Sequence, residues 1–157
     1  MTERIDFNAL AAQCAQEEAR LQFASFSRQD ALALGLLVAQ SAAQYDAGVA
    51  VEITVNGLTV FRYFPEGTTE DNALWLARKR RTVTLTGVSS LHALANLEIA
   101  GESAADRKLD PNDYAFGGGG FPILLRGTGM IGVVAVSGLT HWEDHALVVR
   151  CIEAFLG

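Results

Sequence analysis

The sequence GGGGFPILLRGTGMIGVVAVSGLTHWEDH, residues 117–145, decides the fold of this 157-residue chain. It holds two apolar runs that are typical of β-strands, Ile123–Arg126 and Met130–Val136, separated by a short glycine-bearing turn. An acidic, histidine-bearing segment follows, and Thr140 and Glu143 have the spacing of a helix capping box. We therefore expect an antiparallel hairpin that leads directly into a C-terminal helix.

A second hairpin lies upstream of this stretch. Val49–Val55 and Leu58–Phe64 read as strands, and Asn56-Gly57 between them is a strong signal for a two-residue turn with positive φ angles. The short segment Leu21–Phe26 contains two aromatic residues, and we predict it as a fifth strand. Short connections within both hairpins favour antiparallel pairing throughout the sheet.

Helices are expected around these strands. Ser27 and Asp30 form an approximate capping box before an apolar helix. The predicted helices cover Phe7–Arg20, Ala31–Gln44, Thr69–Thr86, Ser90–Gly101 and the segment after Thr140. The predicted fold is one α/β (α+β) domain, residues 1–157: a three-layer α/β/α sandwich around a five-stranded antiparallel sheet, profilin-like or PAS-like.

Composition limits the classes of function. Half of the residues are hydrophobic and 19% are charged, as expected for a globular protein. The net charge of −6 argues against general nucleic-acid binding, which needs a positive surface. No apolar stretch is long enough to span a bilayer and no targeting segment is recognisable, so we expect a cytoplasmic protein without a membrane partner. Cys14 and Cys151 are expected to be separate reduced thiols.

The glycine run Gly117–Gly120 is the main candidate site. It lacks the Lys-Ser or Lys-Thr and the following helix of a phosphate-binding loop, and a strand follows where a dinucleotide fingerprint needs a helix. Three interpretations remain: a flexible loop tip, close packing against a neighbouring subunit, or the wall of a small-molecule pocket.

Two other groups of residues carry chemistry. Trp75, Arg78 and Lys79 share one helical face, so an aromatic ring with two cations could bind an anionic ligand. The alternative is a solvated helix end with Trp75 in the core or in an interface. His141 and His145 stand at i, i+4 and could ligate a metal in a metal-dependent enzyme, although histidines in a first helical turn are more often solvated. No nucleophile elbow and no obvious carboxylate pair is present.

A set of short motifs in this sequence resembles the haem-degrading-domain superfamily, the HbpS-like and GlcG-like group, and in particular its small uncharacterised cytosolic branch. The resemblance covers roughly residues 25–157. The motifs are Asp71-Asn72, Trp75, Arg78–Arg80, Ser89-Ser90, Gly118–Ile123, Ile131-Gly132, Val136–Leu139, Asp144-His145 and Val148-Val149.

The resemblance implies a closed homo-oligomer, built from dimers or as a larger ring, with haem as a candidate cofactor because some secreted members bind it. The chain departs from the branch at Gly117 and Gly120, where many members carry His and Ser. We expect a small-molecule pocket, for an anionic or haem-like ligand, near the glycine run at a subunit interface. The predicted ligand-binding residues are Trp75, Arg78, Lys79, Gly118, Gly119, Phe121, Asp144 and His145, and no catalytic residue is assigned. The alternative is a non-catalytic assembly protein without a ligand.

Overall fold

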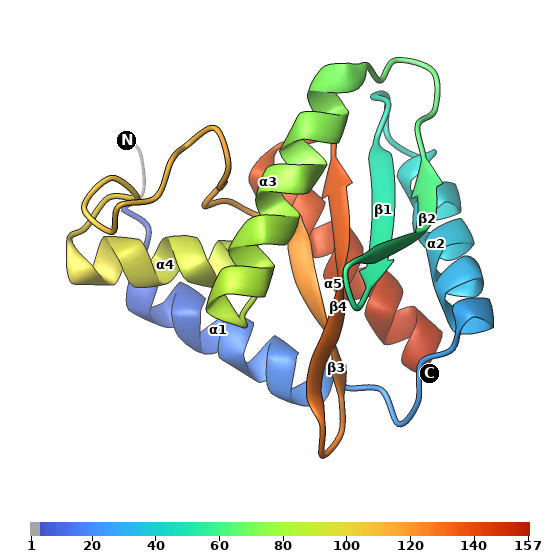
Figure 1. The fold of residues 1–157 in the computed structure, drawn as a ribbon, viewed down its shortest axis with the longest axis horizontal. Coiled ribbons are helices and arrows are strands. Elements are labelled where there is room, and N and C mark those ends of the chain that lie inside the picture. The colour runs from blue at the N-terminus through green and yellow to red at the C-terminus, as the bar shows by residue number, and fades with distance from the viewer. Residues whose placement is uncertain (1–3) are drawn as a thin grey trace.

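The computed structural model describes residues 4–157, which form five helices and four strands (Figure 1). In chain order these are α1 (Phe7–Arg20), α2 (Arg28–Ala42), β1 (Ala50–Val55), β2 (Leu58–Tyr63), α3 (Glu70–Thr86), α4 (Ser90–Ala100), β3 (Gly120–Leu125), β4 (Gly129–Ser137) and α5 (His141–Leu156). The predicted mixed α+β class and both predicted hairpins are confirmed.

The strands form one antiparallel sheet in the order β2-β1-β4-β3. Asn56 and Gly57 have φ angles of 50° and 82°, as the tight turn between β1 and β2 requires. The centre of the sheet is the pairing of β1 with β4, in which Ala50 lies opposite Ser137. Each hairpin therefore contributes one inner and one edge strand.

The predicted fifth strand over Leu21–Phe26 is wrong. In the structure only Phe23 bridges to β3: its backbone N–H donates to the Leu124 carbonyl at 2.8 Å and its carbonyl accepts from the Arg126 N–H at 2.9 Å. Its ring is buried and packs edge-on against Phe26, with the ring centroids 5.0 Å apart. The aromatic residues that suggested a strand fill the core instead, and the three-layer profilin-like or PAS-like layout stays a prediction.

Helices contact both faces of the sheet. Helix α3 crosses the near face in Figure 1, while α2 and α5 lie behind the strands. Val51 and Ile53 of β1 belong to the large apolar core shared with α2 and α5. The residues that alternate with them along the strand point to the opposite face of the sheet, toward α3, where Ala50 packs with Leu76 and Ala135. This alternation places the main core between the sheet and the helix pair α2 and α5.

Three helices begin at capping boxes, two of which the sequence had indicated. Ser27, Thr69 and Thr140 each accept a backbone hydrogen bond from the first turn of α2, α3 and α5, and a side chain in that turn returns the bond. The cap at Thr140 fixes where α5 starts and hence where His141 and His145 lie. Within residues 4–157, none of the helices combines the length and apolar character that crossing a lipid bilayer demands.

Candidate functional site

The glycine run lies inside the molecule, against the first turn of α5. Gly118, Gly119 and Gly120 are buried, which argues against the interpretation of this run as a flexible loop tip. A side chain at Gly118 would collide with the backbone carbonyl of His141, and one at Gly120 would lie 2.9 Å from Val83. The contacts that demand glycine at these positions thus come from the same chain. A neighbouring subunit is not needed to explain them.

A hollow of about 770 Å³ opens beside this run. Its walls come from the first half of α3, the loop before β3, and the turn between β4 and α5. Aromatic and apolar side chains dominate part of the lining, among them Trp75, Tyr114, Phe116 and Leu139. Four of the eight predicted ligand-binding residues line it, namely Trp75, Lys79, Gly118 and Asp144. The other four, Arg78, Gly119, Phe121 and His145, do not belong to the lining.

Lys79 and Asp144 form a buried ion pair in the wall of the hollow. Lys79 Nζ lies 3.0 Å from Asp144 Oδ2 and also donates to the Val136 carbonyl at 2.8 Å. The second carboxylate oxygen of Asp144 accepts from the Leu139 backbone N–H at 3.2 Å. Burial raises the pKa of Asp144 above its ordinary value, and the neighbouring ammonium group opposes that effect. Lys79 is therefore occupied by Asp144 and offers no free positive charge to a ligand.

Arg78 stacks on Trp75, as their i, i+3 spacing predicted. The guanidinium carbon lies 4.8 Å from the centroid of the indole ring, and Arg78 Nε donates to the Asn112 carbonyl at 3.2 Å. Trp75 remains 41% exposed, so it is not a core residue. Cation–π attraction holds the pair together, so the Arg78 cation lies against Trp75, which lines the hollow.

His141 projects from the first position of α5 into the hollow. Its Nδ1 atom accepts a hydrogen bond from the Gly118 N–H at 3.4 Å, and its ring packs on Trp142 with centroids 4.3 Å apart. Desolvation, and then the nearby charge of Lys79, lower the pKa of His141 below its ordinary value. The ring is thus neutral at pH 7, and because Nδ1 accepts, Nε2 carries the hydrogen.

Phe121 and His145 lie behind this wall rather than in it. Phe121 is fully buried in the main core, and its ring centroid is 6.1 Å from that of His145. His145 Nε2 bonds to Glu17 Oε1 on α1 at 2.7 Å. The two histidines of α5 therefore serve different partners, and in the described part of the chain no group of three metal-binding side chains contains both. The structure gives no support to a metal site built on His141 with His145.

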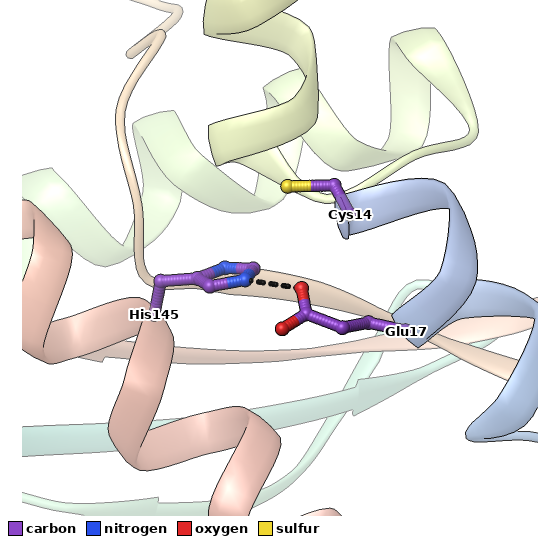
Figure 2. A group of neighbouring side chains, drawn as sticks. All are labelled: Cys14, Glu17 and His145. Carbon is purple, nitrogen blue, oxygen red and sulfur yellow. Dashed lines mark hydrogen bonds and ion pairs between the residues drawn. The ribbon is translucent and has the colours of Figure 1, made fainter. Parts of the chain in front are cut away.

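A cluster that the sequence did not indicate surrounds His145. Cys14 and Glu17 of α1 face it, all three side chains are buried, and their ligand atoms lie within 4.8 Å of one another (Figure 2). Burial, reinforced by the charge of Glu17, raises the pKa of the Cys14 thiol to about 12. Burial alone would also raise the pKa of Glu17, but its hydrogen bond and charge interaction with His145 hold it below the ordinary value.

Comparison with known proteins identifies similar chains. A family model described as haem degrading protein HbpS-like matches residues 26–153. A protein of Streptomyces coelicolor called UPF0303 protein is 40% identical over 147 residues, which is 93% of this chain and 93% of that one.

Solved structures share the fold. The crystal structure of the Ybr137w protein covers 98% of this chain and 88% of its own, with a TM-score of 0.85 and 28% identity. The match to the crystal structure of a PduOC:heme complex covers 83% of this chain and 94% of that one, with a TM-score of 0.68. At 22% identity this match shows the fold alone.

Proposed function

Because this chain belongs to the HbpS-like haem degrading protein family, we propose that it is a cytoplasmic, single-domain ligand-binding protein. Its ligand is a flat, largely apolar molecule that carries an anionic group, and haem is the first candidate. The hollow beside the glycine run carries this proposal. Its volume of about 770 Å³ lies in the range of small-molecule sites, roughly 300–1,000 Å³, and aromatic side chains line it.

The chain's residues suit haem in two respects and limit it in a third. Trp75, Tyr114 and Phe116 supply apolar contacts for a macrocycle, and Arg78, which stacks on Trp75, supplies a cation for a propionate group. His141 is the histidine of the hollow and is neutral, as an iron ligand must be. Its Nε2, however, carries the hydrogen while Nδ1 accepts from Gly118. Ligation through Nε2 would therefore require the other tautomer and the loss of this long hydrogen bond.

A solved structure of the same fold, the complex of PduOC with heme, supports haem as the first probe. The binding residues proposed here are Trp75, Arg78, Gly118 and His141, with Lys79 and Asp144 as the buried pair that holds the wall. Gly119, Phe121 and His145, also predicted as ligand-binding, act through packing in this proposal.

Titration of the purified protein with haemin, followed by the Soret band, tests the proposal. We expect saturable binding at one haem per chain, weakened at least about 10-fold by Trp75→Ala and by His141→Ala. His92→Ala is the matched control, because His92 lies on α4 and pairs with Glu18 away from the hollow. Binding that is absent, or that all three variants retain equally, would overturn the haem proposal.

The alternative function, an assembly protein without a ligand, would use a different surface as its interface. A hollow of about 930 Å³ lies between α2, β2 and the loops next to them, lined in part by Leu36, Phe61 and Tyr63. Leu36 and Tyr63 are about half exposed. We propose that a second copy of the chain covers this face in a homo-oligomer, either dimer-based or a larger ring.

Light scattering after size exclusion tests this part separately. Leu36→Asp should dissociate the assembly, whereas Leu85→Asp, a similarly exposed leucine on α3, should not. A wild-type protein that runs as a monomer would remove self-association and leave the haem test untouched. An assembled protein without haem binding would favour the assembly alternative.

A further inference from the structure

We propose that Cys14, Glu17 and His145 bind a divalent transition-metal ion of the zinc class. Each residue supplies one ligand atom: the sulfur of Cys14, a carboxylate oxygen of Glu17 and a ring nitrogen of His145. The site lies between α1 and α5, behind the wall of the glycine hollow. It does not depend on the haem proposal, since none of these three side chains lines that hollow.

The two helices bring the ligand atoms together. Cys14 and Glu17 stand at i, i+3 on α1, so both project from one face of that helix. Figure 2 shows α5 presenting the imidazole of His145 to this face, with its hydrogen bond to Glu17. The ligand atoms of the three residues are all within 4.8 Å of one another before any ion is present.

This spacing is close to what zinc needs. Bonds of about 2.3 Å to sulfur and about 2.0–2.2 Å to nitrogen and oxygen, at tetrahedral angles, place ligand atoms about 3.3–3.6 Å apart. The contact between His145 Nε2 and Glu17 Oε1, now 2.7 Å, must open by less than about 1 Å. The sulfur of Cys14, at most 4.8 Å from the other two ligand atoms, must close by no more than about 1.5 Å.

A second histidine–glutamate pair, in which the glutamate also lies on α1 but the histidine lies on α4, allows a comparison. His92 Nδ1 lies 3.0 Å from Glu18 Oε1, which is a pair of the same kind. Among the described residues, however, only the pair with His145 has a cysteine sulfur within ligand distance. A thiolate adds the soft ligand that selects zinc-like ions over Mg²⁺ and Ca²⁺. A thiolate and a carboxylate together also neutralise the charge of a divalent ion, which favours its burial.

Glu17 and His145 also line a small hollow of about 540 Å³ on the surface between α1 and α5. This hollow provides a route for the ion and leaves a fourth coordination position open to water, as in zinc sites with three protein ligands. Cys14 holds its proton in the metal-free protein, so the ion displaces that proton to solvent as the sulfur–metal bond forms. The hydrogen that His145 Nε2 donates to Glu17 must also leave this nitrogen, and it moves to Nδ1 as the ring takes its other tautomer.

Spectroscopy with Co²⁺, which replaces zinc and is coloured, tests the proposal on the full chain after a chelator has stripped its metals. We expect one Co²⁺ per chain, with the near-ultraviolet band of a thiolate–cobalt bond, and displacement of the cobalt by Zn²⁺. Loss of an outer-shell partner already lowers metal affinity roughly 10–100-fold. Removal of a ligand in Cys14→Ala should therefore abolish the thiolate band and weaken Zn²⁺ binding by about 100-fold or more.

Two matched controls complete the design. Cys151→Ala removes the other buried cysteine, and His92→Ala removes the other glutamate-paired histidine, and both should keep the band. No band at one equivalent of Co²⁺, or a band that survives Cys14→Ala, would overturn the proposal. If Cys14→Ala does not fold, the nearly isosteric Glu17→Gln decides: unchanged Zn²⁺ affinity in that variant also overturns it.

Discussion

Replacing Lys79 by methionine should destabilise this fold strongly. The side chain of Lys79 is 8% exposed and that of its partner Asp144 only 2% exposed, so the ion pair lies in the interior. Lys79 also donates a hydrogen bond to the backbone carbonyl of Val136 near the end of β4. Methionine keeps most of the length and volume but removes the charge and the donor, which leaves a buried carboxylate without its cation.

The magnitude follows from this burial. Removing one member of a buried ion pair costs about 3–5 kcal/mol, because the remaining charge stays desolvated. Domains of this kind unfold with a free energy of about 5–15 kcal/mol, so the loss is a large share of the total. With about 2–4 °C of melting temperature per kcal/mol, we expect Tm to fall by about 6–20 °C.

Urea unfolding measured by circular dichroism gives the free energy, and a constant m-value establishes that the mechanism is unchanged. Arg81→Met is the matched control, because Arg81 lies two residues further along α3 and is exposed. It should change the free energy of unfolding by no more than about 0.5 kcal/mol. The double variant Lys79→Met with Asp144→Asn removes both charges while an amide oxygen still accepts from Leu139.

The double variant should be more stable than the sum of the single changes predicts, by about 0.5–3 kcal/mol. Equal effects of Lys79→Met and Arg81→Met would refute the reasoning, since they would mean that the pair is solvated. Strict additivity in the double variant would refute the coupling between Lys79 and Asp144 even if the single variant were unstable.

Three further predictions use other parts of the molecule. Gly118→Ala should cost about 1–3 kcal/mol in urea unfolding, because its methyl group collides with the His141 carbonyl, whereas Gly117→Ala, whose nearest neighbour would be 3.6 Å away, should stay within about 0.5 kcal/mol. NMR titration should give His141 a pKa below 6.5, and loss of the signal in His141→Gln assigns it. The neutral ring contributes its full share of the free energy of unfolding above pH 6.5. This contribution falls as the pH drops below 6.5, because the unfolded state binds the proton first. A midpoint at or above 6.5 would contradict the desolvation argument. In metal-free native protein neither Cys14 nor Cys151 should react with a thiol reagent at mildly alkaline pH, because burial raises the pKa of both thiols, and both should react in urea; reaction of either before unfolding would contradict this.

Local signals in the sequence predicted the elements well. Asn56-Gly57 specified its turn because its φ angles are intrinsic to those residues, and the caps at Ser27 and Thr140 depend on neighbours only three positions away. The segment at Phe23 failed for the opposite reason. Aromatic residues indicate that a segment packs against buried apolar surface, but not that it pairs as a strand. Packing in the surrounding core limits the pairing of this segment with β3 to the single bridge at Phe23.

The candidate sites were less predictable, because they depend on partners far apart in the chain. Lys79 looked like a free cation for a ligand, and only the fold reveals Asp144 beside it, 65 positions away. His145 looked like a partner of His141 at helical spacing, yet its ring meets Glu17, 128 positions away. Spacing along one helix shows which residues share a face, but not which element that face meets.

The central place of the β1–β4 pairing has a consequence for how the chain folds during synthesis. The β1–β2 hairpin leaves the ribosome early, with the inner edge of β1 unpaired until β4 has been made. The entropy cost of closing the long loop between β1 and β4 must be met before their hydrogen bonds and contacts form. We therefore expect slow folding late in translation. In that interval the exposed edge of Ala50–Val55 is open to pairing with other chains. Chaperone dependence and losses to aggregation during expression should therefore depend on β4, and substitutions that weaken β4 should lower yield more than their effect on final stability suggests.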